Sequence, residues 1–204
     1  MMFWDRVAGV YDLFVNGYNR RVHQKLKKAV AYRIGAADSV LECACGTGMI
    51  TQAVAPRCRK IMATDFSKKM LEQTLKKCRH FDNVNVMEAD ILDLGFEDES
   101  FDVVIAANVI HLLDEPLRAL SELDRVCRKD GLIIIPTYMN KNEDGDTSGL
   151  SKTLGKAGAD FKREFTFTTY RQFFEEAGYE GASYEMIEGR VPCAVAFLRK
   201  KGSI

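Results

Sequence analysis

From Ser39 onward, short apolar runs alternate with amphipathic segments. Such runs are typical of buried strands, and apolar residues at helical spacing are typical of helices packed on a sheet. This alternation predicts an α/β fold, a mostly parallel sheet with helices on both faces. The predicted strands cover residues 39–43, 60–65, 84–89, 101–107 and 132–135, and the predicted helices between them cover residues 49–58, 67–80 and about 116–131.

Capping residues define the ends of the predicted helices. Ser67 is expected to cap one helix, Pro116 to begin the next, and Gly131 to end it. Thr168 or Thr169 is expected to cap a last helix that ends near residue 177. The residues expected to face the core are Met70, Leu71, Leu75 and Cys78 in the first of these helices and Leu117, Leu120, Leu123 and Val126 in the second.

The two ends of the chain depart from this alternation. Residues 1–35 are predicted to be helical, and residues 140–165 are polar and glycine-rich, which is typical of a lid or binding loop. Two β-like runs, 182–188 and 193–199, predict an antiparallel hairpin on the sheet edge. We therefore expect one domain, residues 1–204, with a seven-stranded Rossmann-like sheet: a helical cover (1–35), a core (36–139), a lid (140–165) and a closing helix and hairpin (166–204).

Composition narrows the class of protein. The 204 residues are 47% hydrophobic and 28% charged, which favours a packed globular core. Lys and Arg total 29 and Asp and Glu total 29, a balance that disfavours a nucleic-acid partner. No apolar run is long enough for membrane insertion, and no signal peptide precedes the fold, so a cytoplasmic protein is expected. The six cysteines are expected to be reduced core thiols, and no metal site is expected.

The segment Val40-Leu-Glu-Cys-Ala-Cys-Gly-Thr-Gly48 carries the strongest chemical signal. An acidic residue, Glu42, ends a predicted strand, two glycines follow, and a helix begins at once. Glycine lets the backbone turn sharply and approach a ligand closely, and the helix start adds unpaired N–H groups. A dinucleotide site has a small residue at the third fixed position of its motif, where this chain has Met49. A nicotinamide cofactor is therefore disfavoured.

The segment resembles motif I of the class I S-adenosylmethionine-dependent methyltransferases, E/D-x-G-x-G-x-G. Glu42 holds the acidic place and Gly46 and Gly48 the last two glycines, while Ala44 replaces the first glycine. The family's next landmark is an acidic residue that ends the second strand and binds both ribose hydroxyls. Asp65 matches that landmark at close to the usual spacing of about 20 residues.

The later landmarks of the family also occur in order. The resemblance places an acidic residue beside the adenine amino group after the third strand, where Asp90 and Ile91 lie, and places the methyl donor at the end of the fourth strand. Because residues 93–99 are rich in acidic residues, the alternative interpretation of Asp90 is a solvated surface residue. Glu42 has the alternative of capping the glycine loop. The resemblance implies S-adenosyl-L-methionine as cofactor, and the residues assigned to its site are Glu42, Ala44, Gly46, Thr47, Gly48, Asp65, Phe66, Met70, Asp90, Ile91, Asn108 and Val109.

Two residues are candidates for catalysis. His111 follows the fourth strand, where a histidine of near-neutral pKa can act as a general base; its alternative is a residue that only shapes the pocket. The N-terminal Phe3-Trp-Asp-Arg-Val-Ala-Gly-Val-Tyr11-Asp12 is similar to the opening of the ubiquinone and menaquinone (type 11) methyltransferase subgroup. That resemblance places Tyr11 near the methionine end of the cofactor or the acceptor. Tyr18 and Tyr138 are further candidates for the acceptor pocket.

We therefore expect an enzyme that transfers a methyl group from S-adenosylmethionine to a small-molecule acceptor by in-line displacement. Two alternatives remain: a protein that binds S-adenosylmethionine without turnover, and a nicotinamide-dependent oxidoreductase. The identity of the acceptor, the type of atom methylated and the oligomeric state stay open.

Overall fold

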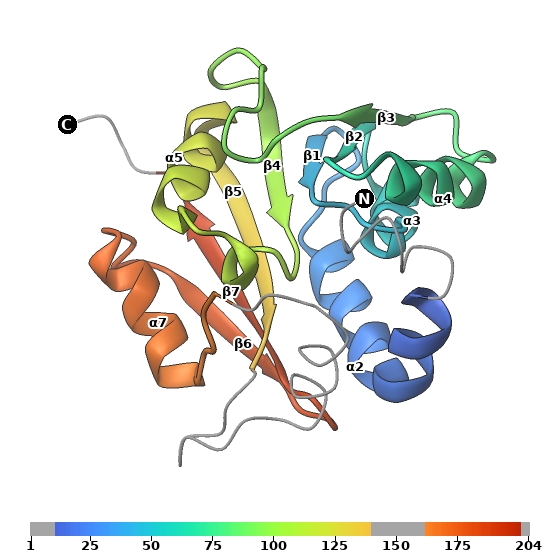
Figure 1. Ribbon diagram of the computed structural model, residues 1–204. Coiled ribbons are helices and arrows are strands. Elements are labelled where there is room, and N and C mark those ends of the chain that lie inside the picture. The colour runs from blue at the N-terminus through green and yellow to red at the C-terminus, as the bar shows by residue number, and fades with distance from the viewer. Residues whose placement is uncertain (1–10, 140–161, 201–204) are drawn as a thin grey trace.

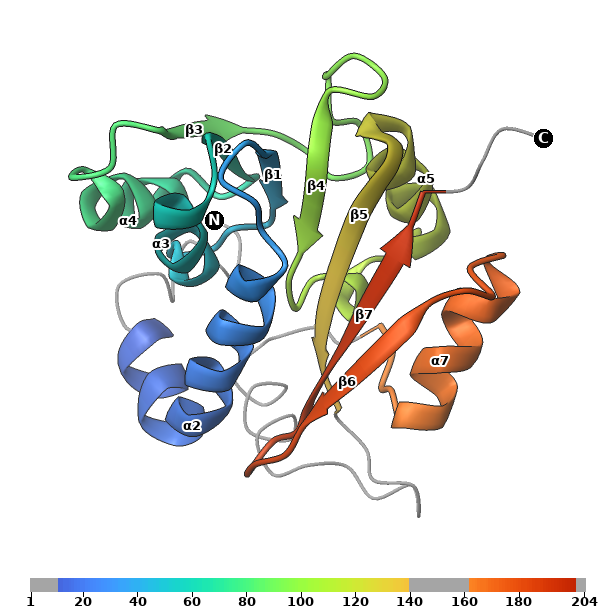
Figure 2. The ribbon, with the colours of Figure 1, turned by 180° about the vertical axis from the view of Figure 1, so that it is seen from behind.

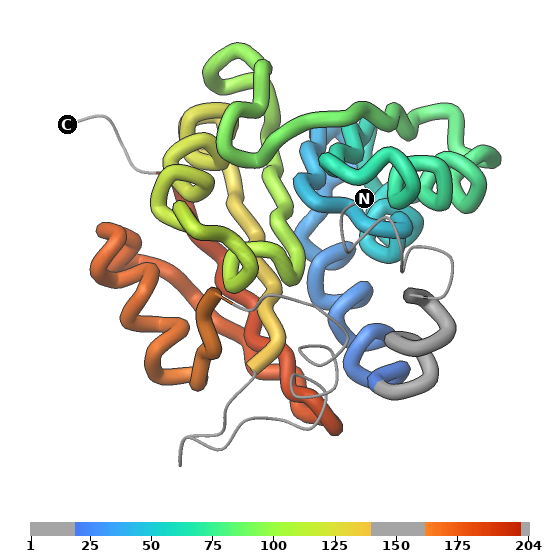
Figure 3. Tube along the Cα trace, viewed as in Figure 1, coloured from blue at the N-terminus to red at the C-terminus, as the bar shows by residue number. Residues whose placement is uncertain are grey.

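The computed structural model describes residues 11–139 and 162–200, and their side chains from residue 19 onward (Figure 3). The helices are α2 (Tyr11–Tyr32), α3 (Met49–Val54), α4 (Lys68–Cys78), α5 (Pro116–Val126) and α7 (Phe167–Glu176), with the 3-10 turns η1 (Ala55–Arg57) and η2 (Ile110–Leu112). The strands are β1 (Ser39–Cys43), β2 (Lys60–Asp65), β3 (Val84–Glu88), β4 (Phe101–Ala106), β5 (Cys127–Tyr138), β6 (Ser183–Ile187) and β7 (Cys193–Arg199). Most of the predicted lid, 140–165, lies outside the described residues.

The seven strands form one sheet in the order β3-β2-β1-β4-β5-β7-β6 (Figures 1 and 2). Strands β1 to β5 pair in parallel, and β7 runs antiparallel to both β5 and β6. The predicted Rossmann-like sheet with an antiparallel C-terminal hairpin is thus confirmed. Because parallel strands all end at the same edge, the loops after β1 to β4 are brought together at that edge.

Alternate residues of the central strands enter two separate apolar clusters, one on each face of the sheet. On one face, Val104 of β4 packs in a cluster with residues of α5 and α7. On the other face, Ile105 packs in a cluster with residues of α2 and α3. Figure 1 shows these two groups of helices on opposite sides of the sheet. Burial on both faces explains why these strands are continuous apolar runs.

Two of the predicted core residues are wrong. Leu75 of α4 is 54% exposed and Leu117 of α5 is 60% exposed. Each lies one residue after a buried residue, Thr74 and Pro116, and one residue is about 100° around a helix. The buried face of α5 instead follows Pro116, Ala119, Leu120, Leu123 and Val126.

The fifth strand and the last helix begin earlier than predicted. Strand β5 starts at Cys127, so Gly131 lies inside the strand and does not end α5. The pairing of β4 with β5 changes register before Leu132, and a Cβ on Gly131 would lie 2.6 Å from the Cys127 sulfur. Glycine is therefore required there by close packing. The cap of α7 is Thr166, which exchanges backbone-to-side-chain hydrogen bonds with Thr169 in a capping box.

The cysteines are all buried and free, as predicted for reduced core thiols. Burial raises the pKa of Cys43 and of Cys193 to about 12, so neither is a reactive thiolate at neutral pH. Among the described residues, no group of three or more His, Cys, Asp or Glu is placed to hold a metal ion. Within the same part of the chain, no helix combines the length and apolar character needed to cross a bilayer.

The contrast between Leu123 and Leu117 gives a test of the packing of α5. Leu123 is fully buried against the sheet, so Leu123→Ala should lower the free energy of unfolding by about 2–5 kcal/mol. Leu117→Ala should lower it by no more than about 0.5 kcal/mol, because the side chain is already largely in water. Urea denaturation measures both values, and equal losses in the two variants would contradict this face assignment.

Candidate functional site

Main-chain hydrogen bonds join the loops that follow the first three strands. The Cys45 amide, after β1, donates to the Thr64 carbonyl of β2 at 2.9 Å. The Ala89 amide, after β3, donates to the Asp65 carbonyl at 3.2 Å. The ends of β1, β2 and β3 are therefore adjacent at one edge of the sheet, where the chain leaves the strands (Figure 1).

The loop after β1 depends on left-handed backbone conformations. Gly46 and Gly48 have φ of 55° and 79°, and Ala44 has φ of 52°, so alanine adopts the conformation that glycine favours. A Cβ added to Gly48 would lie 3.0 Å from the Thr74 hydroxyl of α4, whereas one added to Gly46 would meet no atom within 4 Å. Thr47 between them is buried. The loop therefore packs on α4 at Gly48 and leaves open space at Gly46.

Asp65, the last residue of β2, holds this loop in place. Its side chain is buried and accepts hydrogen bonds from the amides of Gly46 and Ser67, each at 2.9 Å. The two amides donate to different carboxylate oxygens. Asp65 thus links the loop after β1 to the end of β2 and to the turn that follows it.

Glu42 is buried one residue before the end of β1. Its carboxyl accepts a hydrogen bond from the Thr51 hydroxyl of α3 at 2.6 Å. Burial raises the pKa of Glu42 to about 8, the Thr51 hydrogen bond opposes this rise, and the nearby Asp65 charge adds to it. Glu42 therefore holds a proton near neutral pH.

The residues after β2 and β3 differ in their exposure. Met70 and Ile91 are buried, and Phe66 is 39% exposed at the turn after β2. Asp90 is exposed, and its carboxylate accepts a hydrogen bond from the Leu92 amide at 2.9 Å, which fixes the turn after β3. A partly exposed ring and a carboxylate thus lie on adjacent turns of the same edge.

Asn108, Val109 and His111 follow β4, as the sequence places them. Asn108 has φ of 55°, its amide donates to the Pro136 carbonyl at 2.7 Å, and its side-chain oxygen accepts from the Tyr138 amide at 3.1 Å. This turn is therefore fastened to the end of β5. Val109 is buried beside it.

His111 lies in η2 and is buried. Burial lowers its pKa to about 4, because the charged imidazolium loses its hydration. The His111 carbonyl also accepts from the amides of Lys162 and Arg163, each at 3.1 Å. The imidazole is therefore neutral at physiological pH, able to accept a proton but weakly basic.

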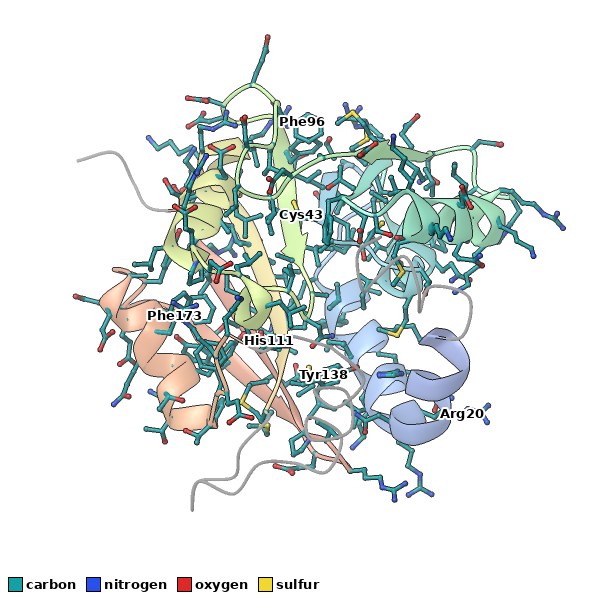
Figure 4. All side chains as sticks on the ribbon, viewed as in Figure 1. Arg20, Cys43, Phe96, His111, Tyr138 and Phe173 are labelled. Atoms are coloured by element: carbon teal, nitrogen blue, oxygen red, sulfur yellow. The ribbon has the colours of Figure 1, made fainter. Side chains whose placement is uncertain are left out.

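Sequence reasoning missed a buried pair at the end of β5. The His23 Nε2 atom of α2 lies 2.5 Å from the Tyr138 hydroxyl, and Figure 4 shows Tyr138 between β5 and α2. Next to it in α2, the Asn19 side chain donates to the Val191 carbonyl at 2.8 Å. No sequence motif predicts the His23–Tyr138 pair, because the two residues are far apart in sequence. Tyr11 begins α2, but its side chain and that of Tyr18 lie outside the described residues.

Comparisons with known proteins decide the family. The sequence profile of the family described as "Methyltransferase domain" matches residues 41–135. The chain is 34% identical over 136 residues to a demethylmenaquinone methyltransferase of Clavibacter sepedonicus. This match covers 65% of this chain and 55% of that protein. The chain is also 30% identical over 140 residues to a phosphatidylethanolamine N-methyltransferase of Cereibacter sphaeroides. That match covers 67% of this chain and 68% of the relative.

The chain belongs to the class I S-adenosylmethionine-dependent methyltransferases, in their type 11 subgroup. It spans only about half the length of the demethylmenaquinone methyltransferase it matches. A solved SAM-dependent methyltransferase of Thermotoga maritima, a possible histamine N-methyltransferase, shares the fold, with a TM-score of 0.76 and 21% identity over 98% of this chain and 99% of that chain.

S-adenosylmethionine is the cofactor of this family, and the described residues fit an adenosyl group. Gly46 faces open space, so a ligand can approach the loop backbone. The Asp65 carboxylate lies beside the same loop, and the ring of Phe66 is accessible for packing against a base. The geometry thus agrees with the chemistry of an adenosyl group at three separate positions.

The raised pKa of Glu42 predicts a specific pH dependence of stability. An unfolded glutamate ionises above its ordinary value of 4.5, whereas folded Glu42 keeps its proton up to about 8, so unfolding releases a proton between these values. The free energy of unfolding should therefore fall as pH rises through this window, by on the order of a few kcal/mol. Glu42→Gln should flatten that fall, as measured by urea denaturation from about pH 5 to about pH 8. An unchanged slope would assign the effect to another group.

Proposed function

We propose that this chain transfers the methyl group of S-adenosylmethionine to a small-molecule acceptor. The observation that carries the proposal is the hydrogen bond between the Gly46 amide and the Asp65 carboxylate. It joins the glycine loop to the acidic strand end, which are the two parts of the site that must face one adenosyl group. Family membership supports the reaction type, and the neutral net charge favours a small acceptor over nucleic acid.

Each loop has a proposed part in holding the cofactor. Asp65 accepts hydrogen bonds from the ribose hydroxyls, while the backbone from Ala44 to Gly48 lies along the methionine part, with Glu42 behind it and Met70 beside it. The turn after β3 and the Phe66 ring enclose the adenine, with Asp90 accepting from its amino group and Ile91 forming an apolar edge. Asn108 and Val109 border the methyl donor. These roles agree with the burial and hydrogen bonds of each residue.

The cofactor supplies a methyl group already activated by the sulfonium charge, and transfer is an in-line displacement. The chain's own contribution is to align the acceptor with that methyl group and to exclude water. His111 is the proposed base for an acceptor atom that must lose a proton, and Tyr11 is proposed to border the acceptor. Segments 1–20 and 140–165 are proposed to form the acceptor pocket and its lid. The named relatives act on a quinone and a phospholipid, and both are small-molecule acceptors.

Cofactor binding can be tested with S-adenosylhomocysteine, the product of transfer. At one hundred times its dissociation constant it should stabilise the chain by roughly 2.7 kcal/mol, and NAD should not stabilise it. Asp65→Asn should weaken S-adenosylhomocysteine binding by at least about tenfold in calorimetry, because an amide nitrogen cannot accept a hydroxyl proton.

Two further variants control this measurement. Asp90→Asn carries little risk to folding, since its side chain is exposed, and should also weaken binding. Asp82→Asn, exposed before β3, should leave affinity unchanged. Full affinity in both Asp65→Asn and Asp90→Asn would refute the proposed site. Binding without any transfer from labelled cofactor to metabolite pools would identify a non-catalytic binding protein.

The role of His111 has a separate kinetic test once an acceptor is known. If His111 accepts the proton, His111→Gln should lower turnover by at least about 10²-fold and leave S-adenosylhomocysteine affinity unchanged. Because the pKa of His111 is about 4, the imidazole stays neutral until the pH falls toward that value. Protonation of His111 should therefore not reduce wild-type turnover above that pH. Retention of turnover in the variant would assign His111 to pocket shape alone.

A further inference from the structure

A concavity lies on the outer side of α3, between α2 and α4. Its volume is about 840 Å³, within the range of small-molecule sites, about 300–1,000 Å³. Figure 1 shows the three helices side by side, and α3 contacts both of the others. The described residues that line this groove include none of those assigned to the cofactor. It is therefore a separate candidate site, which we call the α2–α4 groove.

The α2–α4 groove is strongly basic. Four cationic side chains line it, Lys27, Lys28, Arg57 and Lys77, and no acidic residue is among its described lining. Lys27, Lys28 and Arg57 form no ion pair with any residue that the structure describes. Like charges gathered in a concavity repel one another, and a bound anion relieves that repulsion.

The groove also has an apolar part. Ala31 and Met49 contribute apolar surface, and the ring of Tyr32, at the end of α2, is 84% exposed at its border. An exposed aromatic ring beside several cations suits a ligand that combines negative charge with an apolar or planar group. A free inorganic ion uses only part of these contacts.

Although the charges of the whole chain sum to zero, two of its segments carry charges of one sign only. Residues 13–37 contain six Lys and Arg and no Asp or Glu, whereas residues 81–117 contain no Lys or Arg. Arg20 is one of these six residues and lies on α2 (Figure 4). A field of this kind draws anions toward α2 from a distance and raises their rate of association.

We propose that the α2–α4 groove is a binding site for a phosphate-bearing anion. Phosphate oxygens accept hydrogen bonds from several Lys and Arg side chains at once, and the two or more charges of a phosphate ester or diphosphate match the four cations. Two sources supply this chemistry, a soluble phosphate compound and the headgroup of an anionic phospholipid. The site is independent of the cofactor site and does not rest on the proposed methyl transfer.

The experiment compares two charge-reversed variants of the full chain. Lys28→Glu/Arg57→Glu changes two exposed residues of the groove. The matched control, Lys25→Glu/Lys76→Glu, makes the same change in net charge at two exposed residues outside its described lining. Pyrophosphate binding is measured by calorimetry, and vesicle binding is measured by sedimentation with phosphatidylcholine alone and with added phosphatidylglycerol. Thermal unfolding with S-adenosylhomocysteine verifies that each variant folds.

We expect the groove variant to weaken binding by at least about tenfold and the control to change it by less than about threefold. Pyrophosphate binding that only the groove variant loses indicates a soluble ligand. Vesicle binding that only the groove variant loses, seen with phosphatidylglycerol vesicles alone, indicates a lipid headgroup. Both outcomes support the site. Equal losses in the two variants would show a general charge effect and overturn the proposal. Absence of binding to both probes at about 0.15 M salt would overturn it as well.

Discussion

The hydrogen bond from the Gly46 amide to the Asp65 carboxylate is the contact on which the arrangement of the site depends. Strands β1 and β2 pair along their length, but pairing alone does not fix the path of the loop that leaves β1. Asp65 accepts from that loop and from the next helix start at Ser67, so one buried side chain fixes two turns. Leaving such a buried group without its donors costs about 1–3 kcal/mol, which ties the shape of the loop to the stability of the fold.

Burial also determines the charge state of the site. Glu42 is driven toward its protonated form and His111 toward its neutral form, both chiefly because a buried charge loses its hydration. The pKa of Glu42 is therefore raised and that of His111 lowered from their ordinary values. An edge of the sheet that looks rich in charge from its residue names is thus less charged in the folded chain.

The neutral net charge conceals an uneven distribution. Cations gather on α2 and the neighbouring α3–α4 side, and the segment from β3 to the start of α5 carries acids without Lys or Arg. Composition alone gives only the sum, and a sum of zero disfavours a nucleic-acid partner. Folding places the basic residues of α2, η1 and α4 around one groove, which makes a local anion site compatible with a neutral chain.

The sequence by itself determined the order of strands and helices, the hairpin, and the acidic and glycine positions after β1 and β2, because these follow from local periodicity and from spacing along the chain. It also determined the Ser67 cap, a contact within one turn. It misplaced Leu75 and Leu117, which depend on which side of a helix meets the sheet, and Gly131, which depends on the register shift between β4 and β5. It also misplaced the cap of α7, because Thr166, Thr168 and Thr169 all carry a side chain suited to a cap. Only the tertiary structure decided the Thr51–Glu42 contact, the His23–Tyr138 pair and the basic groove, because each joins residues whose proximity is a product of packing and leaves no periodic signal in the chain.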